Sequence, residues 1–197
     1  GQVCISLQRV YVHEKLYDTF DEKFVAKTKE LITGDPLDEK TDVSALISEK
    51  DVDRVLAWIK EAEASGAEVK TGAAREGNIV LPTVLTNVSP EMKVSCQEVF
   101  GPTVLINSVS SVEDAVKEVN NSRYGLQAGI YTKDIYKALD VSDELEVGGV
   151  MINDIPTFRV DHMPYGGVKE SGTGREGIKY AVEEMTELKL VVVNRNA

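Results

Sequence analysis

The feature that most constrains the fold of this chain is the alternation of helix-like and strand-like segments along its 197 residues. The first helix-like segment places Leu16, Phe20, Phe24 and Leu31 on one face of a helix that is predicted to end near Gly34. A loop rich in Gly, Pro and Asp follows. An alternation that begins in this way is typical of a sheet with helices packed on it.

The alternation continues to the end of the chain. A second amphipathic helix is predicted to end at Gly66, and a third to begin with the Ser-x-x-Asp cap of Ser111. Later helices are predicted in DIYKALDVSDEL, up to Gly148 and Gly149, and in REGIKYAVEEM. The strand-like segments are short, often β-branched and bounded by Gly, Pro or Asn: VCISLQRVYV, EVKTG, IVLPTVLTNV, PTVLINSVS, LQAGIYT, GVMIN and TELKLVVVN. The order predicts an α/β fold with a mostly parallel sheet, helices on both faces and a final edge strand.

Composition limits the classes of function. An apolar share of 42% and a charged share of 28% are typical of a folded globular protein. The net charge of −11 would repel nucleic acid and anionic membranes, so neither is expected as a partner. We expect a cytoplasmic protein, because no leader is visible, no apolar stretch approaches about 18 residues and only two cysteines occur.

A glycine pattern near the end of the chain resembles a dinucleotide-binding fingerprint. SGTGREG places Gly172, Gly174 and Gly177 as G-x-G-x-x-G. The pattern follows a loop rather than a strand, and no acidic residue stands in the tail VVNRNA where a ribose partner would be needed. We therefore interpret it as a glycine-rich entry to a helix.

The two cysteines differ in their surroundings. Cys4 has two interpretations: a small buried hydrophobe, or a reactive thiol beside backbone N–H groups that converge at the Gly1-Gln2 chain entry. Cys96 has no neighbouring base or cation that would activate it, so a structural role is expected.

Few other residues have the pattern of a site. Glu98 stands one residue before Val99-Phe100-Gly101-Pro102, where it could hold a hydroxylated ligand or simply face solvent. Arg159 and His162, near Phe158 and Tyr165, could line a pocket or be solvated. No metal site is expected, because His13 and His162 are the only histidines and no acidic cluster lies between them.

Taken together, four stretches resemble the C-terminal catalytic part of the aldehyde dehydrogenase superfamily. GQVC is similar to the G-Q-x-C nucleophile motif and QEVFGP to the E-x-F-G-P motif. NNSRYGLQAGIYT is similar to the family's Asn-Asn-Ser-x-Tyr-Gly-Leu segment, and MPYGGVKESGTGRE to its P-[FY]-G-G-x-K-x-S-G-x-G-R-E loop. The four occur in the family's order and cover essentially the whole chain.

The resemblance implies a role for each of several residues. Cys4 would attack an aldehyde to give a thiohemiacetal, which passes hydride to NAD or NADP and becomes a thioester that water hydrolyses, and its backbone N–H would form half of an oxyanion hole. Glu98 would hold the nicotinamide ribose and Phe100 the nicotinamide ring. Tyr165 would form a wall of the aldehyde tunnel beside a substrate-dependent loop that contains Phe158 and Arg159.

The resemblance also implies how the chain is organised. Residues 1–185 would form the catalytic domain, and residues 186–197 an oligomerisation strand, Thr186 to Val193, and a tail, which makes a homo-oligomer the expected state. In the family the cofactor domain, the general-base Glu and the oxyanion-hole Asn precede the nucleophile, and this chain begins three residues before Cys4. We therefore expect the isolated chain to be a fragment with an incomplete NAD or NADP site and little or no turnover.

The sequence leaves substrate and chemistry partly open. The loop VMINDIPTFRVDHMPYGG resembles that of bacterial and archaeal relatives that act on lactaldehyde or on anionic aldehydes, for which Arg159 could pair with the anion. Val3 stands where relatives that use phosphorylated aldehydes often have Arg. A small aldehyde is therefore the predicted substrate. A CoA-acylating dehydrogenase and a non-catalytic assembly module are the alternatives.

Overall fold

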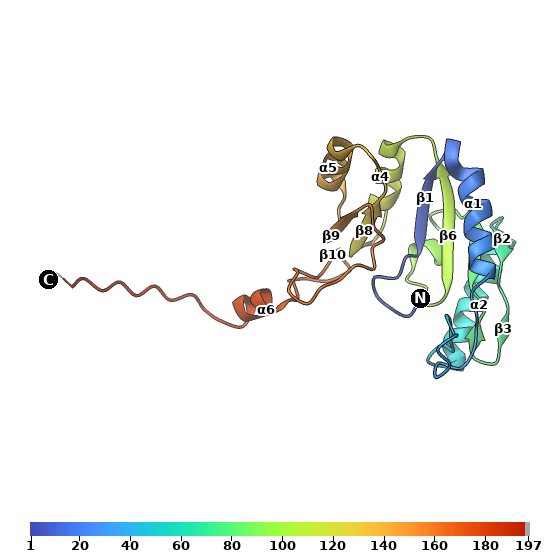
Figure 1. Ribbon diagram of the computed structural model, residues 1–197, viewed down its shortest axis with the longest axis horizontal. Coiled ribbons are helices and arrows are strands. Elements are labelled where there is room, and N and C mark those ends of the chain that lie inside the picture. Colours follow the sequence, from blue (N-terminus) through green and yellow to red (C-terminus); the bar gives the residue numbers. More distant parts are fainter. Residues whose placement is uncertain (196–197) are drawn as a thin grey trace.

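The computed structural model describes residues 1–195 (Figure 1), so the last two residues of the expected tail lie outside the described part of the chain. The strands are β1 (Arg9–His13), β2 (Glu68–Thr71), β3 (Arg75–Glu76), β4 (Ile79–Val80), β5 (Thr83–Thr86), β6 (Thr103–Val109), β7 (Tyr124–Gly125), β8 (Gln127–Ile130), β9 (Gly149–Ile152) and β10 (Val168–Lys169). The helices are α1 (Glu14–Lys29), α2 (Glu49–Ala64), α3 (Lys93–Cys96), α4 (Val112–Asn120), α5 (Ile135–Glu144) and α6 (Ile178–Glu184).

A four-stranded sheet in the order β1-β6-β5-β2 forms the centre of the larger part of the molecule. β6 pairs in parallel with β1 on one side and with β5 on the other, which confirms the mostly parallel α/β sheet. The edge strand β2 is antiparallel to β5. In the sequence, only the short antiparallel pair β3–β4 separates β2 from β5. A short connection of this kind suits antiparallel neighbours, whereas parallel neighbours need a long crossover.

Two hydrophobic cores lie on opposite faces of this sheet, because successive side chains of a strand point to opposite sides. Leu85 and Leu105 pack with α2 residues such as Val55 in one core. Val84 and Ile106 pack with Phe20 and Phe24 of α1 in the other. Both faces of the parallel strands are therefore covered by helices, as the sequence predicts.

A smaller layer adjoins the β1 side of the sheet (Figure 1). It contains the parallel pair β8–β9, the antiparallel pair β7–β10, and helices α4 and α5. Ser111 precedes the first residue of α4, and its side chain accepts a hydrogen bond from the Asp114 backbone at 3.0 Å, so the Ser-x-x-Asp cap is confirmed.

Several predicted boundaries are wrong. The opening strand begins only at Arg9, since residues 1–8 form turns that expose Cys4 to the site described below. α1 ends at Lys29, short of Gly34, and α5 ends at Glu144, well before Gly148. In each case part of the predicted element forms a loop instead.

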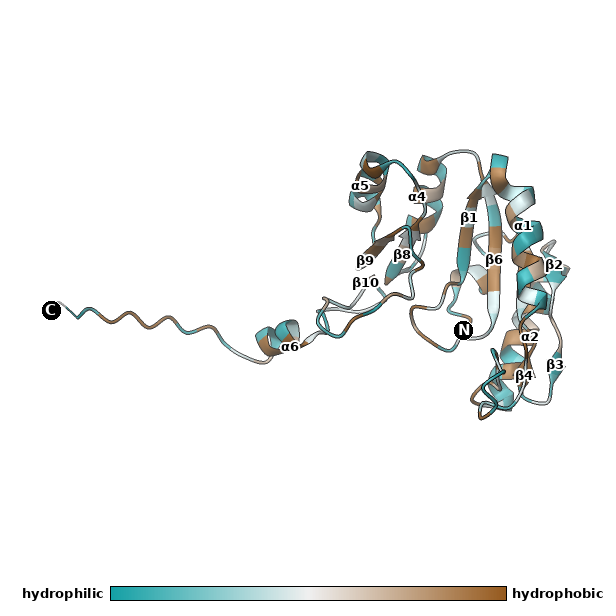
Figure 2. Ribbon diagram, viewed as in Figure 1, coloured by the Kyte–Doolittle hydropathy of each residue, from teal (hydrophilic) through white to brown (hydrophobic). Residues whose placement is uncertain are grey.

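The C-terminal segment extends away from the rest of the molecule, beyond α6 (Figure 1). Residues 186–195 contain no assigned strand. Much of this segment is coloured as hydrophobic in Figure 2. Five of its apolar residues are each at least 71% exposed: Leu188, Leu190, Val191, Val192 and Val193. A segment of this composition has a strand pattern but no neighbour within the described chain to pair with.

Candidate active site

Cys4 lies in a tight turn just before β1. The turn is closed by the Ser6 backbone, which donates to the Val3 carbonyl at 2.9 Å, and Ile5 is buried beneath it. The Cys4 side chain is exposed, which is against the interpretation of Cys4 as a buried hydrophobe. Within residues 1–195 the structure assigns no acceptor to the Cys4 backbone N–H. Both the thiol and this N–H are therefore open to a ligand.

Two side chains fasten the Glu98–Gly101 segment beside this turn. Gln8 Nε2 donates to the Val94 and Gln97 carbonyls at 3.0 and 2.8 Å, and Gln8 Oε1 accepts from the Val99 N–H at 3.0 Å. Arg54 of α2 donates to the Val99 carbonyl at 2.9 Å. The segment that follows the Cys4 turn is thus joined through Gln8 to the QEVFGP motif, about ninety positions away in the sequence.

Phe100 has an unusual backbone conformation, with φ at 51°. A bulky residue rarely adopts this left-handed region, so the flanking contacts must hold it there. The ring is 40% exposed and Glu98 is also exposed. Both side chains are therefore accessible to a ligand.

A cavity of about 370 Å³ brings these residues together. Cys4, Glu98 and Phe100 all line it, with Tyr11 and Tyr124 among the other residues of its wall. Its volume is at the small end of the range for ligand sites, about 300–1,000 Å³. The sequence-predicted nucleophile and cofactor residues therefore share one cavity.

Tyr165 contacts Cys4 directly. Its hydroxyl lies 2.7 Å from Cys4 Sγ, and the residue is only 8% exposed. Burial, the hydrogen bond and charge interaction with Cys4, and then the charge of Glu176 raise the pKa of Tyr165 to about 12, against the smaller opposite effect of Arg159. Tyr165 therefore keeps its phenolic proton at neutral pH.

The predicted substrate loop lies behind Tyr165. Arg159 stacks on the Tyr165 ring, with its Cζ 4.9 Å from the ring centre, and pairs with Asp161 at 3.4 Å and Glu176 at 3.7 Å. Phe158 is half exposed, and its carbonyl accepts from Gln127 Nε2 at 3.2 Å. Gln127 lines the cavity, whereas Phe158, Arg159 and Tyr165 are not among its lining residues.

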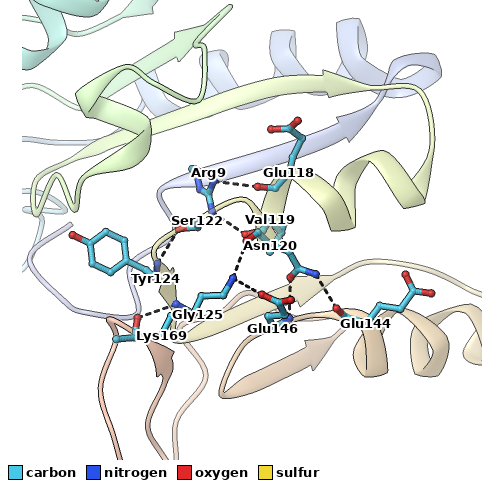
Figure 3. Close-up of polar contacts among 11 residues, drawn as sticks. Arg9, Glu118, Val119, Asn120, Ser122, Tyr124, Gly125, Glu144, Glu146 and Lys169 are labelled. Carbon is cyan, nitrogen blue, oxygen red and sulfur yellow. Dashed lines mark hydrogen bonds and ion pairs between the residues drawn. The ribbon is translucent and has the colours of Figure 1, made fainter.

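The remaining two motifs meet at a junction between α4, α5 and β10 (Figure 3). Lys169 donates to the Asn120 carbonyl at 2.7 Å and pairs with Glu146 at 2.6 Å. The Asn120 side chain donates to the Glu144 carbonyl and accepts from the Glu146 N–H, both at 2.8 Å. These residues support the cavity wall from behind.

Arg9 connects this junction to β1. Its guanidinium donates to the Glu118 and Val119 carbonyls at 3.3 Å, at the end of α4 where carbonyl groups lack helical partners (Figure 3). Tyr11, whose hydroxyl accepts from Arg9 at 3.2 Å, has a raised pKa chiefly because it is buried. Arg9 thus joins the cavity wall to the sheet.

The sequence alone indicates no role for Gln8, Arg9, Asn120 or Lys169. Asn120 and Lys169 stand inside the quoted motifs, so the motifs offered a signal for them. Gln8 and Arg9 lie inside an apparently continuous strand and offered none.

The structure gives less support to a reactive Cys96, a metal site or a membrane-spanning helix. Cys96 is partly buried and donates to the Glu91 carbonyl at 3.4 Å. In residues 1–195 no group of three or more His, Cys, Asp or Glu is placed to hold a metal ion. No helix of that described part is long and apolar enough to cross a membrane.

Comparison with known proteins gives relatives over nearly the whole chain. The chain is 51% identical over 194 residues to the 3-sulfolactaldehyde dehydrogenase of Priestia aryabhattai, which covers 98% of this chain and 41% of that protein. It is 49% identical to the lactaldehyde dehydrogenase of Methanococcus maripaludis strain C7, with 98% and 42% covered. The chain thus spans about 41% of the length of these curated relatives.

Solved structures of aldehyde dehydrogenases are also similar to this chain. Aldehyde dehydrogenase 21 from Physcomitrella patens, in complex with the reaction product succinate, has a TM-score of 0.96 and 47% identity, over 100% of this chain and 41% of that chain. The glyceraldehyde-3-phosphate dehydrogenase of Methanocaldococcus jannaschii, complexed with NADP, has a TM-score of 0.92 and 43% identity, over 96% and 41%. Betaine aldehyde dehydrogenase from Staphylococcus aureus, in complex with NAD+, has a TM-score of 0.89 and 33% identity, over 93% of this chain and 38% of that chain.

The family description "Aldehyde dehydrogenase family" matches residues 1–191, which include the Cys4 turn, the Glu98–Gly101 segment and the Asn120–Lys169 junction. With this match and relatives of about 50% identity over nearly its full length, the chain belongs to the aldehyde dehydrogenase family, whose members use NAD or NADP.

Proposed function

We propose that the protein containing this chain oxidises a small aldehyde to its carboxylic acid with NAD or NADP, and that Cys4 is the nucleophile. The observation that most supports this is the cavity in which the exposed Cys4 thiol meets Glu98 and Phe100. A thiolate suits the reaction because it is strongly nucleophilic near neutral pH and its thioester is an activated acyl group.

The chain's own residues would act as follows. Cys4 Sγ forms a bond to the aldehyde carbon while the carbonyl oxygen becomes an oxyanion. The Cys4 backbone N–H, which has no acceptor within the described chain, donates to that oxygen. Tyr165 forms a wall beside the reacting carbon, and Phe158 lies in the adjoining loop.

Glu98 and Phe100 would hold the nicotinamide end of the cofactor, through the ribose hydroxyls and the ring respectively. When bound, NAD or NADP supplies the oxidising capacity that takes the adduct from the aldehyde to the acid level. The two side chains fit this task because both are exposed at the cavity while their backbone is fastened by Gln8 and Arg54.

For the substrate we propose a short aldehyde, with anionic members of this class included. The relatives named above include dehydrogenases of lactaldehyde and 3-sulfolactaldehyde, and one neighbour was solved with succinate. Arg159, beside Tyr165, would contribute positive charge near the cavity if the substrate displaced one of its carboxylate partners.

We further propose a cytoplasmic homo-oligomer. In this assembly residues 1–185 act as the catalytic domain, and Thr186 to Val193 pair as a strand with another subunit. The exposed apolar side chains of that segment support this, because an unpaired apolar strand is a template for strand addition.

The test uses the complete reading frame that encodes the chain and follows reduction of NAD and NADP with lactaldehyde, 3-sulfolactaldehyde and succinic semialdehyde. Cys4→Ala is expected to lower the rate by at least about a thousandfold, because the nucleophile is lost. The matched control, Cys96→Ala, is expected to retain most activity. Equal losses in the two variants would contradict the assignment.

Two alternatives are outcomes of the same assay. Turnover that requires added CoA would indicate a CoA-acylating enzyme. Absence of turnover from a reading frame without an upstream cofactor domain would indicate a non-catalytic assembly module.

A further inference from the structure

The hydroxyl of Tyr165 is placed at the reactive atom itself. Tyr165 Oη lies 2.7 Å from Cys4 Sγ, across 161 positions of sequence. In the part of the chain that the structure describes, no other side chain is assigned a hydrogen bond to this sulfur. A wall residue needs only its ring, so the hydroxyl needs a separate explanation.

Tyr165 is fixed on several sides. Its backbone exchanges two hydrogen bonds with Glu176, at 3.1 and 2.6 Å. Arg159 covers the ring at 4.9 Å and reaches the Glu176 carboxylate at 3.7 Å. A donor held in this way loses little entropy when it binds a charge, which makes it preorganised.

The chemistry of the pair sets the direction of the hydrogen bond. Because the pKa of Tyr165 is raised to about 12, the phenol keeps its proton near neutral pH. A thiolate has no proton to donate. The phenol must then be the donor and the sulfur the acceptor.

We propose that the Tyr165 hydroxyl is a hydrogen-bond donor to the Cys4 thiolate and holds the nucleophile in its charged form, an inference that rests on the proposed role of Cys4. Tyr165 is not the base that deprotonates the thiol, because a phenol with a pKa of about 12 is not ionised near neutral pH. The donor has two opposite effects: it increases the thiolate fraction at a given pH, and it makes each thiolate less nucleophilic.

These opposite effects give the proposal a distinctive signature in Tyr165→Phe. Losing a hydrogen bond to the thiolate is expected to lower the thiolate fraction near neutral pH about tenfold. The remaining thiolate becomes more nucleophilic by about half of that change on a logarithmic scale, which is about threefold. Alkylation of Cys4 by iodoacetamide is therefore expected to be about threefold slower than in the wild type near pH 7. At alkaline pH, where the thiol is fully ionised, it is expected to be about threefold faster.

Other ionisable groups near Cys4 bear on this profile. Those that line the cavity are the amino group of Gly1, Arg9, Tyr11, Glu98, Tyr124 and Glu170. Only the amino group ordinarily titrates between about pH 6 and 9, and burial lowers its pKa here. The profile is therefore measured on the 197-residue chain with a free and with an acetylated amino terminus.

The experiment follows modification of Cys4 and Cys96 in the same sample by peptide mass spectrometry between pH 6 and 10. Cys96 serves as the internal reference. The matched control is Tyr17→Phe, which removes a hydroxyl on α1 that donates to the Ile106 carbonyl at 3.4 Å. It is expected to leave both rates unchanged.

The outcomes separate the two proposals. Crossing profiles for wild type and Tyr165→Phe support the donor role. Superimposable profiles, or a uniform loss at every pH, overturn it while leaving Cys4 as the nucleophile if Cys4 still reacts faster than Cys96. Equal reactivity of the two wild-type cysteines counts against the proposed function, whatever Tyr165→Phe does.

A second measurement covers the case in which Tyr165→Phe does not fold. In Cys4→Ala the Tyr165 phenol, followed by NMR of ¹³C-labelled tyrosine, is expected to ionise at lower pH than in the wild type, because the thiolate that opposes ionisation is gone. An unchanged titration would overturn the proposal.

Discussion

At the scale of single residues, the site depends on polar side chains that fasten backbone rather than on the nucleophile alone. Gln8 is the main example, since one amide satisfies two carbonyls and one N–H of the segment that presents Glu98 and Phe100. Removing the partner of a partly buried backbone group destabilises the folded state, because water does not fully replace the lost hydrogen bond. Phe100, held at a positive φ, depends on this support.

Gln8→Ala is expected to lower the free energy of unfolding by about 2 kcal/mol, because it leaves three backbone groups without partners. Urea denaturation followed by circular dichroism measures the change. The matched control is Gln2→Ala: Gln2 also bonds backbone, at Ala45 and Ile47, but it is exposed, so water can replace it. A loss in Gln2→Ala as large as in Gln8→Ala would contradict this explanation.

At the scale of elements, the smaller layer is joined to the main sheet at the ends of its helices and strands. α4 ends at Asn120, where its last carbonyls accept from Arg9 of β1 and from Lys169 of β10. Cations at a helix C-terminus also interact favourably with the helix dipole. The two family-like motifs that contain Asn120 and Lys169 therefore act first as a structural joint behind the cavity.

Asn120→Ala is expected to destabilise the chain by about 1–2 kcal/mol, because the side chain bonds two backbone groups at the end of α5. The neighbouring Asn121→Ala is the matched control: that residue is exposed, and no side-chain hydrogen bond is assigned to it within residues 1–195. Thermal unfolding compares the two variants. If Asn121→Ala were the more harmful, the joint would have to be assigned differently.

At the scale of the whole molecule, the chain has a well-packed sheet with two cores and an extended C-terminal segment whose apolar side chains are exposed. Contiguous exposed apolar surface of this kind marks an interaction site in most proteins. We expect the net charge of −11 not to prevent association, because the segment extends away from the rest of the molecule (Figure 1).

The 197-residue chain is expected to self-associate, with a mass by light scattering above the 21.6 kDa of one chain. Replacing Leu190 and Val192 together by Lys is expected to restore a monomer, because charged residues on an edge strand oppose pairing. Ile47→Lys, at another apolar position that is 86% exposed, is the control and is expected to change nothing. A wild-type monomer at high concentration would contradict the prediction.

How much the sequence could predict differs between elements and contacts. Helical and strand periodicities depend on neighbours a few positions away, so α2, the Ser111 cap and the parallel strands could be predicted from residues alone. The start of β1 could not, because it depends on contacts of residues 1–8 with the Glu98–Gly101 segment, about ninety positions away.

The sequence by itself determined the alternating α/β architecture and the family-like motifs around Cys4, Glu98 and Tyr165, since these are local patterns of residue type. Only the tertiary structure decided that Cys4 is exposed, that Gln8 fastens the Glu98 segment, and that the Tyr165 hydroxyl lies on the sulfur. The physical reason is that a hydrogen bond joins atoms within about 3 Å of each other whatever their separation in sequence, and only the packed fold brings such atoms together.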